Sequence, residues 1–131
     1  MKKLVIHTDG VSKGNPGQAS IGVIIRDEKG GMVASISQSI GRATNNQAEY
    51  RAIIAALEEA LPLNADEIEL NSDSELVVKQ VKGQYRVRKE TLRPLYQQVK
   101  QLQGNLKGFK IKHVPRQQNR EADKLANAAL K

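Results

Sequence analysis

The spacing of the apolar residues changes partway along the chain, and this change limits the possible folds more than any other feature. Residues 3–9, 20–27 and 32–40 are short apolar stretches separated by turns rich in Gly, Asn and Asp. Such stretches predict strands. Because short turns join them, the three strands should form an antiparallel meander.

From residue 44 onward, segments with helical spacing alternate with short strands. The predicted helices cover residues 44–61, 74–82, 91–103 and 119–130, and the predicted strands cover residues 67–71 and 109–113. A meander followed by alternating strands and helices favours an α/β fold, with a five-stranded mixed sheet and helices on both faces. Right-handed crossovers would place the later strands parallel to the first, in the order 3-2-1-4-5.

Length and composition narrow the class of protein. The 131 residues suit one domain that spans residues 1–131. The absence of cysteine excludes a disulfide scaffold, a cysteine-ligated metal and thiol catalysis. No apolar run approaches the roughly 20 residues of a membrane span, and the apolar start is too short for a signal peptide. We therefore expect a cytoplasmic monomer with no membrane contact.

The charge of the chain is distributed unevenly. Residues 1–78 hold 7 Lys/Arg and 11 Asp/Glu, a net charge of −4, whereas residues 79–131 hold 14 and 3, a net charge of +11. A basic half indicates either contact with a polyanion such as nucleic acid or a solvated basic surface. Aromatic residues make up only 3% of the chain, which argues against a surface of several stacked rings.

Four acidic residues lie at the ends or first turns of the predicted elements. Asp9 ends the first strand, Asp73 follows the fourth, and Glu49 and Asp123 lie about one turn into the first and last helices. Strands 1 and 4 are neighbours in the predicted sheet, so Asp9 and Asp73 should lie close together. Taken singly, each acid also has a structural interpretation as a turn, cap, helix-dipole or solvent-facing residue.

Four local patterns decide between these interpretations. They are Thr8-Asp9-Gly10 with Gly14-Asn15-Pro16-Gly17, Thr44-Asn45-Asn46-Gln47-Ala48-Glu49, Ser72-Asp73-Ser74 and Asn119-Arg120-Glu121-Ala122-Asp123-Lys124-Leu125-Ala126. With these patterns in this order, the chain resembles type 1 ribonuclease H and its fold. The stretch His113-Val114-Pro115-Arg116 is similar to that of the compact archaeal-type members.

The resemblance implies an endonuclease that hydrolyses the RNA strand of RNA–DNA hybrids. It would leave 5′-phosphate and 3′-hydroxyl ends, and Asp9, Glu49, Asp73 and Asp123 would be the catalytic, metal-binding carboxylates. Two Mg²⁺ ions bound together with substrate, or Mn²⁺ in their place, can activate water and stabilise the leaving oxygen. Without metal, repulsion between the four acids should raise some of their pKa values.

The resemblance also implies roles for residues around the acids. His113 would be a mobile proton shuttle beside the site, or else a strand-end residue with a local hydrogen bond, and Arg116 would contact phosphate. The predicted substrate contacts are Gly10, Ser12, Asn15, Arg42, Thr44, Asn45, Asn46 and Gln47. Turn formation and helix capping are the structural alternatives for these residues. None of the contacts requires a base edge, so cleavage should be largely independent of sequence.

The chain departs from the longer family members in one region. Those members carry a basic protrusion with tryptophans, whereas residues 83–89 alone join the helices here and the chain has no tryptophan. Two alternative functions therefore stay open. The first is a catalytically weak nucleic-acid-binding module, and the second is a nuclease that also acts on double-stranded RNA or RNA–DNA junctions.

Overall fold

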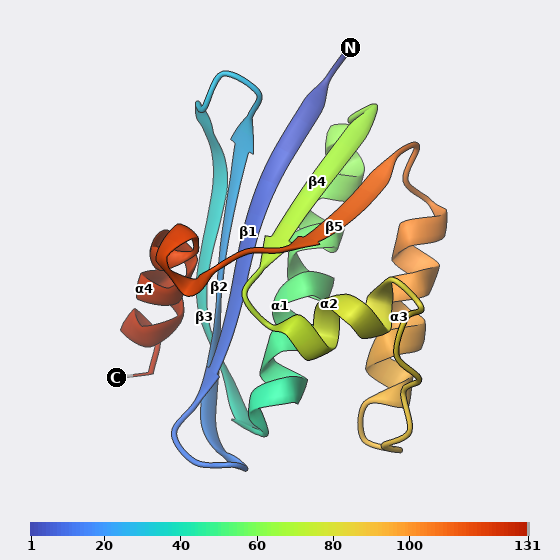
Figure 1. The fold of residues 1–131 in the computed structure, drawn as a ribbon. Coiled ribbons are helices and arrows are strands. Elements are labelled where there is room, and N and C mark those ends of the chain that lie inside the picture. The colour runs from blue at the N-terminus through green and yellow to red at the C-terminus, as the bar shows by residue number, and fades with distance from the viewer. Residues whose placement is uncertain (131) are drawn as a thin grey trace.

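Five strands form one mixed sheet in the computed structural model, which describes residues 1–130 (Figure 1). The spatial order is β3-β2-β1-β4-β5, as predicted. β1 pairs with β2, and β2 with β3, in antiparallel fashion, while β4 pairs in parallel with β1 and β5. The strands are β1 (Lys3–Ser12), β2 (Gly17–Asp27), β3 (Met32–Ala43), β4 (Glu67–Ser72) and β5 (Phe109–His113).

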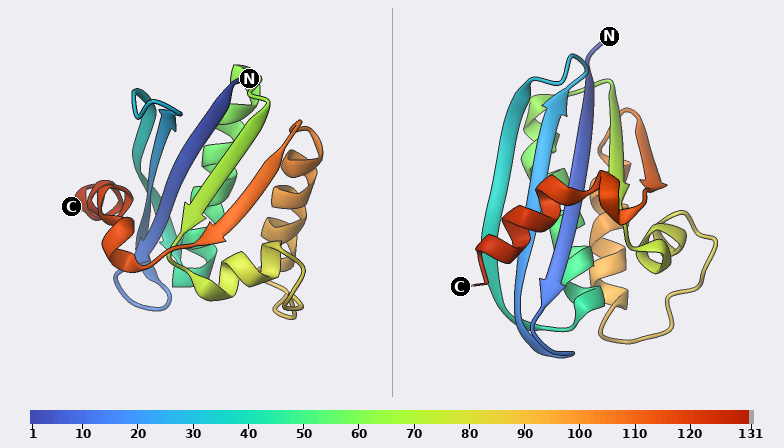
Figure 2. Two further views of the ribbon diagram at one scale, coloured as in Figure 1. Left: turned by 45° about the horizontal axis from the view of Figure 1, so that its top comes forward. Right: turned by 60° about the vertical axis from the view of Figure 1, so that its left-hand side comes forward.

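Helices cover both faces of this sheet, which confirms the predicted α/β architecture. α1 and α3 lie against one face with α2 beside them, and α4 crosses the other face (Figure 2). The helices are α1 (Asn45–Ala60), α2 (Glu75–Val81), α3 (Arg93–Gly104) and α4 (Arg120–Ala128), with short 3-10 turns at Leu61–Leu63 and Arg116–Gln118. Among the described residues, no helix has the length and apolar character needed to cross a membrane.

The main core lies between the sheet and the helices on the α1 side. Alternate residues of the two central strands point into it, including Leu4 and Ile6 of β1. Ile53 and Leu57 of α1 meet them, and both are fully buried. This alternation is the period-2 pattern that predicted the strands, so the apolar pattern alone determines which face of β1 the helix covers.

β1 is longer than predicted, and the extra length matters for the site. The expected strand ends at Asp9, but β1 continues to Ser12. Beyond Thr8 it pairs only with β2, because the parallel pairing with β4 stops at Thr8 and Ser72. Asp9 is therefore the first residue of β1 without a partner on the β4 side, which leaves room beside it.

Two glycines let helices approach the sheet closely. A Cβ at Gly10 would lie 2.2 Å from the carbonyl carbon of Ala48 in α1. A Cβ at Gly22 would lie 2.1 Å from the carbonyl oxygen of Ala122 in α4. Since both neighbours are backbone atoms, no side-chain rotation can relieve either overlap. Gly22 of β2 is the partner of Asp9 of β1. The close contact of α4 with Gly22 therefore places this helix next to Asp9.

We predict that Gly22→Ala destabilises the protein by about 1–3 kcal/mol, the usual cost of overpacking a filled interior. Gly104→Ala is the matched control, because a Cβ there meets no atom within 4 Å, and its free energy of unfolding should be unchanged or slightly higher. Urea unfolding of both variants measures the difference. Equal stability of the two variants would mean that α4 does not depend on this close approach.

Candidate active site

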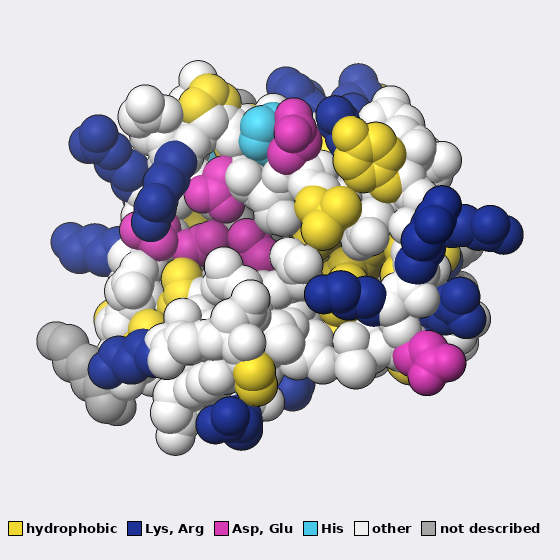
Figure 3. Space-filling model, turned by 60° about the horizontal axis from the view of Figure 1, so that its bottom comes forward, with side chains coloured by type: hydrophobic (Ala, Val, Ile, Leu, Met, Phe, Trp, Pro, Cys, Tyr) yellow, Lys and Arg dark blue, Asp and Glu magenta, His cyan; other side chains and the backbone are white. Residues whose placement is uncertain are grey.

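The fold gathers four acidic side chains where the parallel pairing of β1 with β4 stops. Carboxylate oxygens of Asp9, Glu49 and Asp73 lie within 4.8 Å of one another. Asp123 lines the same cavity, which has a volume of about 280 Å³. Acidic side chains fill a hollow on this face, with Lys and Arg side chains on both sides of it (Figure 3). The four acids predicted from the sequence are thus brought together.

Asp9 and Asp73 come together because each directly follows the last residue pair of the parallel ladder between β1 and β4. Thr8 of β1 and Ser72 of β4 form the last pair of the parallel ladder. Each aspartate is the next residue along its chain, so both side chains lie just past the edge of the ladder. This is the arrangement expected from the predicted strand order.

Glu49 reaches the two aspartates from the first turns of α1. Thr44 and Gln47 form a capping box that defines where the helix begins. One turn later, Glu49 Oε1 accepts a hydrogen bond of 2.8 Å from the backbone N–H of Gly10. The close approach of α1 at Gly10 makes this hydrogen bond possible, and the bond holds the carboxylate beside Asp9.

Asp123 completes the group from the opposite face of the sheet. Because Ala122 lies over Gly22, the next residue of α4 lies beside Asp9, close enough for its carboxyl group to raise the pKa of Asp9. The side chain of Asn127, one turn further along α4, donates a hydrogen bond of 3.0 Å to Asp123 Oδ1. Helices from both faces therefore contribute one acid each.

Burial and mutual repulsion perturb two of these carboxyl groups strongly. Burial, followed by repulsion from Glu49 and the interaction with the Asp123 carboxyl group, raises the pKa of Asp9 to about 9. Burial and repulsion from Asp73 raise the pKa of Glu49 to about 8, although the Gly10 N–H opposes the rise. Repulsion alone was the predicted cause. Burial is the larger one, because these acids are covered by both helices.

The donor atoms of the cavity suit a hard divalent cation. All the acidic ligands are oxygen atoms, which Mg²⁺ and Ca²⁺ prefer. Asp9 Oδ2 is buried and has no hydrogen-bond partner within the described chain. A buried, unpartnered carboxylate oxygen is costly, and a bound cation would satisfy it.

The two basic candidates for the site, His113 and Arg116, lie in different places. Arg116 lines the cavity together with the four acids and Asn45. His113 is exposed at the end of β5, where it pairs with Ser72, and it does not line this cavity. The structure thus brings Arg116, and not His113, to the acids.

Of the predicted substrate-binding residues, Gly10 and Asn45 line the acidic cavity, and most of the others form hydrogen bonds within the protein. Asn15 Oδ1 accepts a hydrogen bond of 3.0 Å from the N–H of Asn45. Ser12 Oγ donates a hydrogen bond of 2.8 Å to the carbonyl of Ala43, and the Gly10 N–H donates one to Glu49. Thr44 and Gln47 cap α1, so their structural interpretation holds.

Two further predicted substrate contacts lie at the start of α1 and just before it. Arg42 is exposed and lines a larger cavity of about 520 Å³ with Gln47, while Asn46 is half-buried in the first turn of α1. Contact of any of these residues with a substrate remains a prediction.

Sequence reasoning left two important residues without a role. Gly22 is one, and only its contact with α4 shows why it matters. Asn119 is the other. It is 1% exposed, and its Nδ2 donates a hydrogen bond of 2.8 Å to the carbonyl of Thr8. The available signal was an uncharged polar residue one helical turn before Asp123.

The raised pKa of Glu49 predicts a pH-dependent stability in metal-free protein. An unfolded glutamate has a pKa near 4.3, so between that pH and about 8 the folded state binds a proton that the unfolded state lacks. The contribution of Glu49 to stability should therefore fall as pH rises through this window and level off above it, while the higher pKa of Asp9 extends the fall in stability to about pH 9. Glu49→Gln keeps the acceptor for Gly10 and removes the charge, so it should be more stable than wild type by about 2–4 kcal/mol at pH 8.

Thermal or urea unfolding between pH 4 and 9, with chelator present, measures this effect. Glu59→Gln is the control, because Glu59 is an exposed residue of the same helix. Parallel pH profiles for wild type and Glu49→Gln would contradict the predicted linkage.

The sequence as a whole is similar to proteins of known families. Residues 7–129 match the family model described as reverse transcriptase-like. Ribonuclease HI of Halobacterium salinarum is 48% identical over 124 residues, which cover 95% of this chain and 62% of that protein. The bifunctional protein Rv2228c of Mycobacterium tuberculosis is 43% identical over 129 residues, covering 98% of this chain and 35% of the relative. The chain thus spans under two thirds of the length of either relative.

Solved structures agree with these matches. The crystal structure of RNase H1 from Halobacterium salinarum superimposes with a TM-score of 0.94 at 45% identity, covering 98% of this chain and 97% of that one. LC11-RNase H1, crystallised in complex with an RNA/DNA hybrid, superimposes with a TM-score of 0.91 at 40% identity, covering 97% and 96%. The fold, the extent of the family match and these identities together place the chain in the reverse transcriptase-like family, as a member of its type 1 ribonuclease H branch.

Proposed function

We propose that this protein is an endoribonuclease that hydrolyses the RNA strand of RNA–DNA hybrids and leaves 5′-phosphate and 3′-hydroxyl ends. The observation that carries the proposal is the gathering of Asp9, Glu49, Asp73 and Asp123 around one cavity. A structural relative that binds an RNA/DNA hybrid supports the choice of substrate. The cytoplasmic location, the monomeric state and a single domain over residues 1–131 stay predictions.

The four acids would hold divalent cations, Mg²⁺ in the first instance and Mn²⁺ as a substitute. The unpartnered Oδ2 of Asp9 and the all-oxygen donor set support this assignment. When bound with substrate, two such cations activate the attacking water, neutralise the phosphate and stabilise the leaving 3′-oxygen. Cation binding would also bring Asp9 and Glu49 to their ionised forms, because a metal favours the charged state of its ligands.

The remaining residues of the cavity would orient these groups and the substrate. The Gly10 N–H holds Glu49 in place, and Asn127 holds Asp123. Arg116 lines the cavity and carries a guanidinium that pairs well with phosphate oxygens. We assign Arg116 to the phosphate next to the cleaved bond. His113 keeps its predicted role as a mobile proton shuttle only if it moves toward the cavity.

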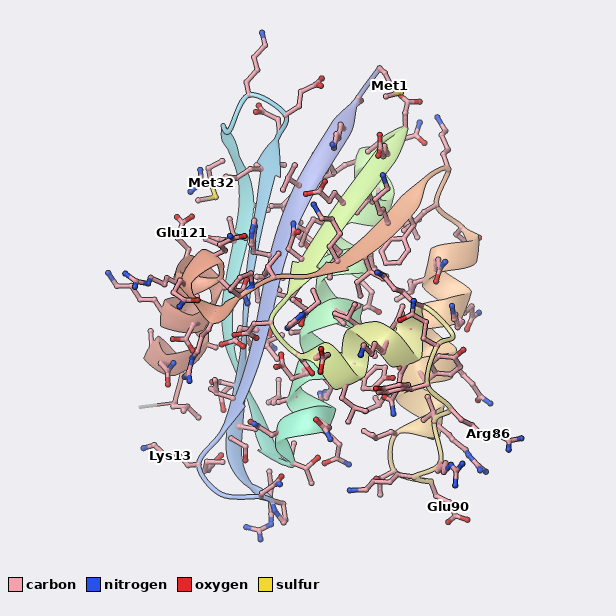
Figure 4. The ribbon with its side chains drawn as sticks, in the orientation of Figure 1. Met1, Lys13, Met32, Arg86, Glu90 and Glu121 are labelled. Atoms are coloured by element: carbon pink, nitrogen blue, oxygen red, sulfur yellow. The ribbon has the colours of Figure 1, made fainter. Side chains whose placement is uncertain are left out.

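Basic side chains on either side of the acids would hold the nucleic-acid backbone. Lys13, on the turn between β1 and β2, and Arg86, on the connection between α2 and α3, project outward on opposite sides of the molecule (Figure 4). In the same connection, the centre of the Tyr85 ring lies 5.0 Å from the ammonium of Lys79 in the last turn of α2. Backbone contacts carry no sequence information, so we propose cleavage that is largely independent of sequence.

Asp9→Asn should abolish cleavage of a labelled RNA–DNA hybrid in Mg²⁺ or Mn²⁺. The substitution keeps the shape of the side chain and removes one of the cation-binding charges. The variant should fold normally, as circular dichroism would show. Asp66→Asn is the control, because Asp66 bonds to Lys2 outside the cavity, and its activity should match wild type. Normal cleavage by Asp9→Asn would remove this cavity from the mechanism.

A panel of substrates separates the proposed function from the alternatives. Wild type is incubated with a hybrid, an RNA duplex, an RNA–DNA junction, a DNA duplex and single strands. Cleavage of the hybrid alone supports the proposal, and cleavage of the RNA duplex or junction as well indicates a broader nuclease. Binding of hybrid without cleavage of any RNA would indicate a binding module instead.

The connection between α2 and α3 should contribute to binding through charge. Arg86→Ala combined with Arg88→Ala should weaken hybrid binding and reduce the slope of log K against log salt by up to about 2, since each lost phosphate contact removes about one unit. The control combines Lys29→Ala with Lys107→Ala, which removes the same charge from turns at the other end of the sheet. Fluorescence anisotropy over a salt series measures both, and equal slopes would exclude the connection from the interface.

A further inference from the structure

The chain between β5 and α4 passes the end of β4 and crosses over β1 partway along its length (Figure 1). We call residues 114–119 the crossing segment. It leaves β5 at His113, passes the end of β4 and residue Thr8 of β1, and enters α4 at Arg120. In this way it links the three elements that carry Asp9, Asp73 and Asp123.

The crossing segment bonds to the residue that precedes each strand aspartate. The N–H of Val114 donates a hydrogen bond of 3.0 Å to the carbonyl of Ser72, just before Asp73. The Nδ2 of Asn119 donates a hydrogen bond of 2.8 Å to the carbonyl of Thr8, just before Asp9. Thr8 and Ser72 are the last pair of the parallel ladder, so the crossing segment supplies the donors at the point where the ladder stops.

Asn119 also connects β1 with the acid on α4. Its own carbonyl accepts a hydrogen bond of 3.1 Å from the N–H of Asp123. One residue therefore holds the backbone beside Asp9 through its side chain and the backbone of Asp123 through its main chain. The first hydrogen bond ends on the residue next to Asp9, and the second is made by Asp123 itself.

Stability alone does not account for a polar residue at this position. Asn119 is 1% exposed, and its Oδ1 has no hydrogen-bond partner among the described residues. Burying an unsatisfied oxygen is unfavourable, and the hydrogen bond of Nδ2 offsets only part of that cost. The side chain does not cap its own helix either, so the contact with Thr8 is the bond that its amide makes.

We propose that Asn119 is a positioning residue that sets the placement of Asp123 against Asp9, and through it the affinity of the cavity for divalent cations. The expected effect on catalysis rests on the proposed function, whereas the expected effect on cation affinity does not. Carboxylates on separate elements bind a small cation well only when their oxygens are held in a fixed arrangement. Without the Asn119 bond, α4 is held to β1 at this point by packing alone.

The test compares Asn119→Leu with Asn119→Ala. Leucine keeps nearly the same size and removes both polar atoms, so it separates the hydrogen bond from packing. We expect Asn119→Leu to fold with an unfolding temperature close to that of wild type. It should bind Mn²⁺ 10–100-fold more weakly in calorimetry and show a similar fall in kcat at fixed cation concentration, with KM for the hybrid little changed. Raising the Mn²⁺ concentration should restore part of the activity.

Asn105→Leu is the matched control, because Asn105 donates a similar hydrogen bond of 3.1 Å to the carbonyl of Gln101 in α3, away from the cavity. It should bind Mn²⁺ as wild type does. Unchanged Mn²⁺ affinity in folded Asn119→Leu would overturn the inference, whatever the activity of the protein. If wild type itself cleaves no hybrid but Asn119→Leu still binds Mn²⁺ more weakly, the proposed function fails and the positioning role stands. If Asn119→Leu does not fold, the calorimetry is repeated on Asn119→Ala with the same two outcomes.

Discussion

The parallel pairing of β1 with β4 is the contact on which the rest of the structure depends. It places two strands that are about 60 residues apart in the chain at the centre of the sheet, and it ends at Thr8 and Ser72. The end of the ladder serves two purposes at once. It leaves an open edge where Asp9 and Asp73 meet, and it leaves two carbonyls that the crossing segment satisfies.

The packing of helices on both faces converts that open edge into a cavity. α1 approaches at Gly10 and α4 at Gly22, and in both cases the absence of a side chain lets backbone meet backbone. Each approach carries an acid inward, Glu49 from one face and Asp123 from the other. The burial that results raises the pKa of Asp9 and Glu49, so the metal-free site is strained electrostatically. A site with this strain favours a cation, since binding relieves both repulsion and desolvation.

The acidic first half and the basic second half of the chain both contribute residues to the cavity. The less basic half supplies three of the four acids, and the basic half supplies Asp123 together with Arg116 and the basic connection between α2 and α3. In the fold the two halves meet at the cavity, so that Lys and Arg side chains lie on both sides of the acidic hollow (Figure 3). A polyanion can therefore approach the acids without facing a uniformly negative surface.

Much of this could be predicted without a structure, because the information is local. The apolar period identifies strands and helices, and the order of elements limits the sheet to few arrangements. The four acids follow from their motifs. Strand ends were less predictable: β1 runs past Asp9 because β2 continues to pair with it, and pairing depends on a partner elsewhere in the chain.

The sequence by itself determined the order of the elements, the faces that they bury and the residues able to bind a cation. Only the tertiary structure decided which residues meet. It brought Arg116 to the cavity and left His113 outside it, made burial the main cause of the raised pKa values, and gave Gly22 and Asn119 their roles. The physical reason is that a close backbone approach, or a hydrogen bond between residues 111 positions apart, leaves no periodic pattern in a sequence.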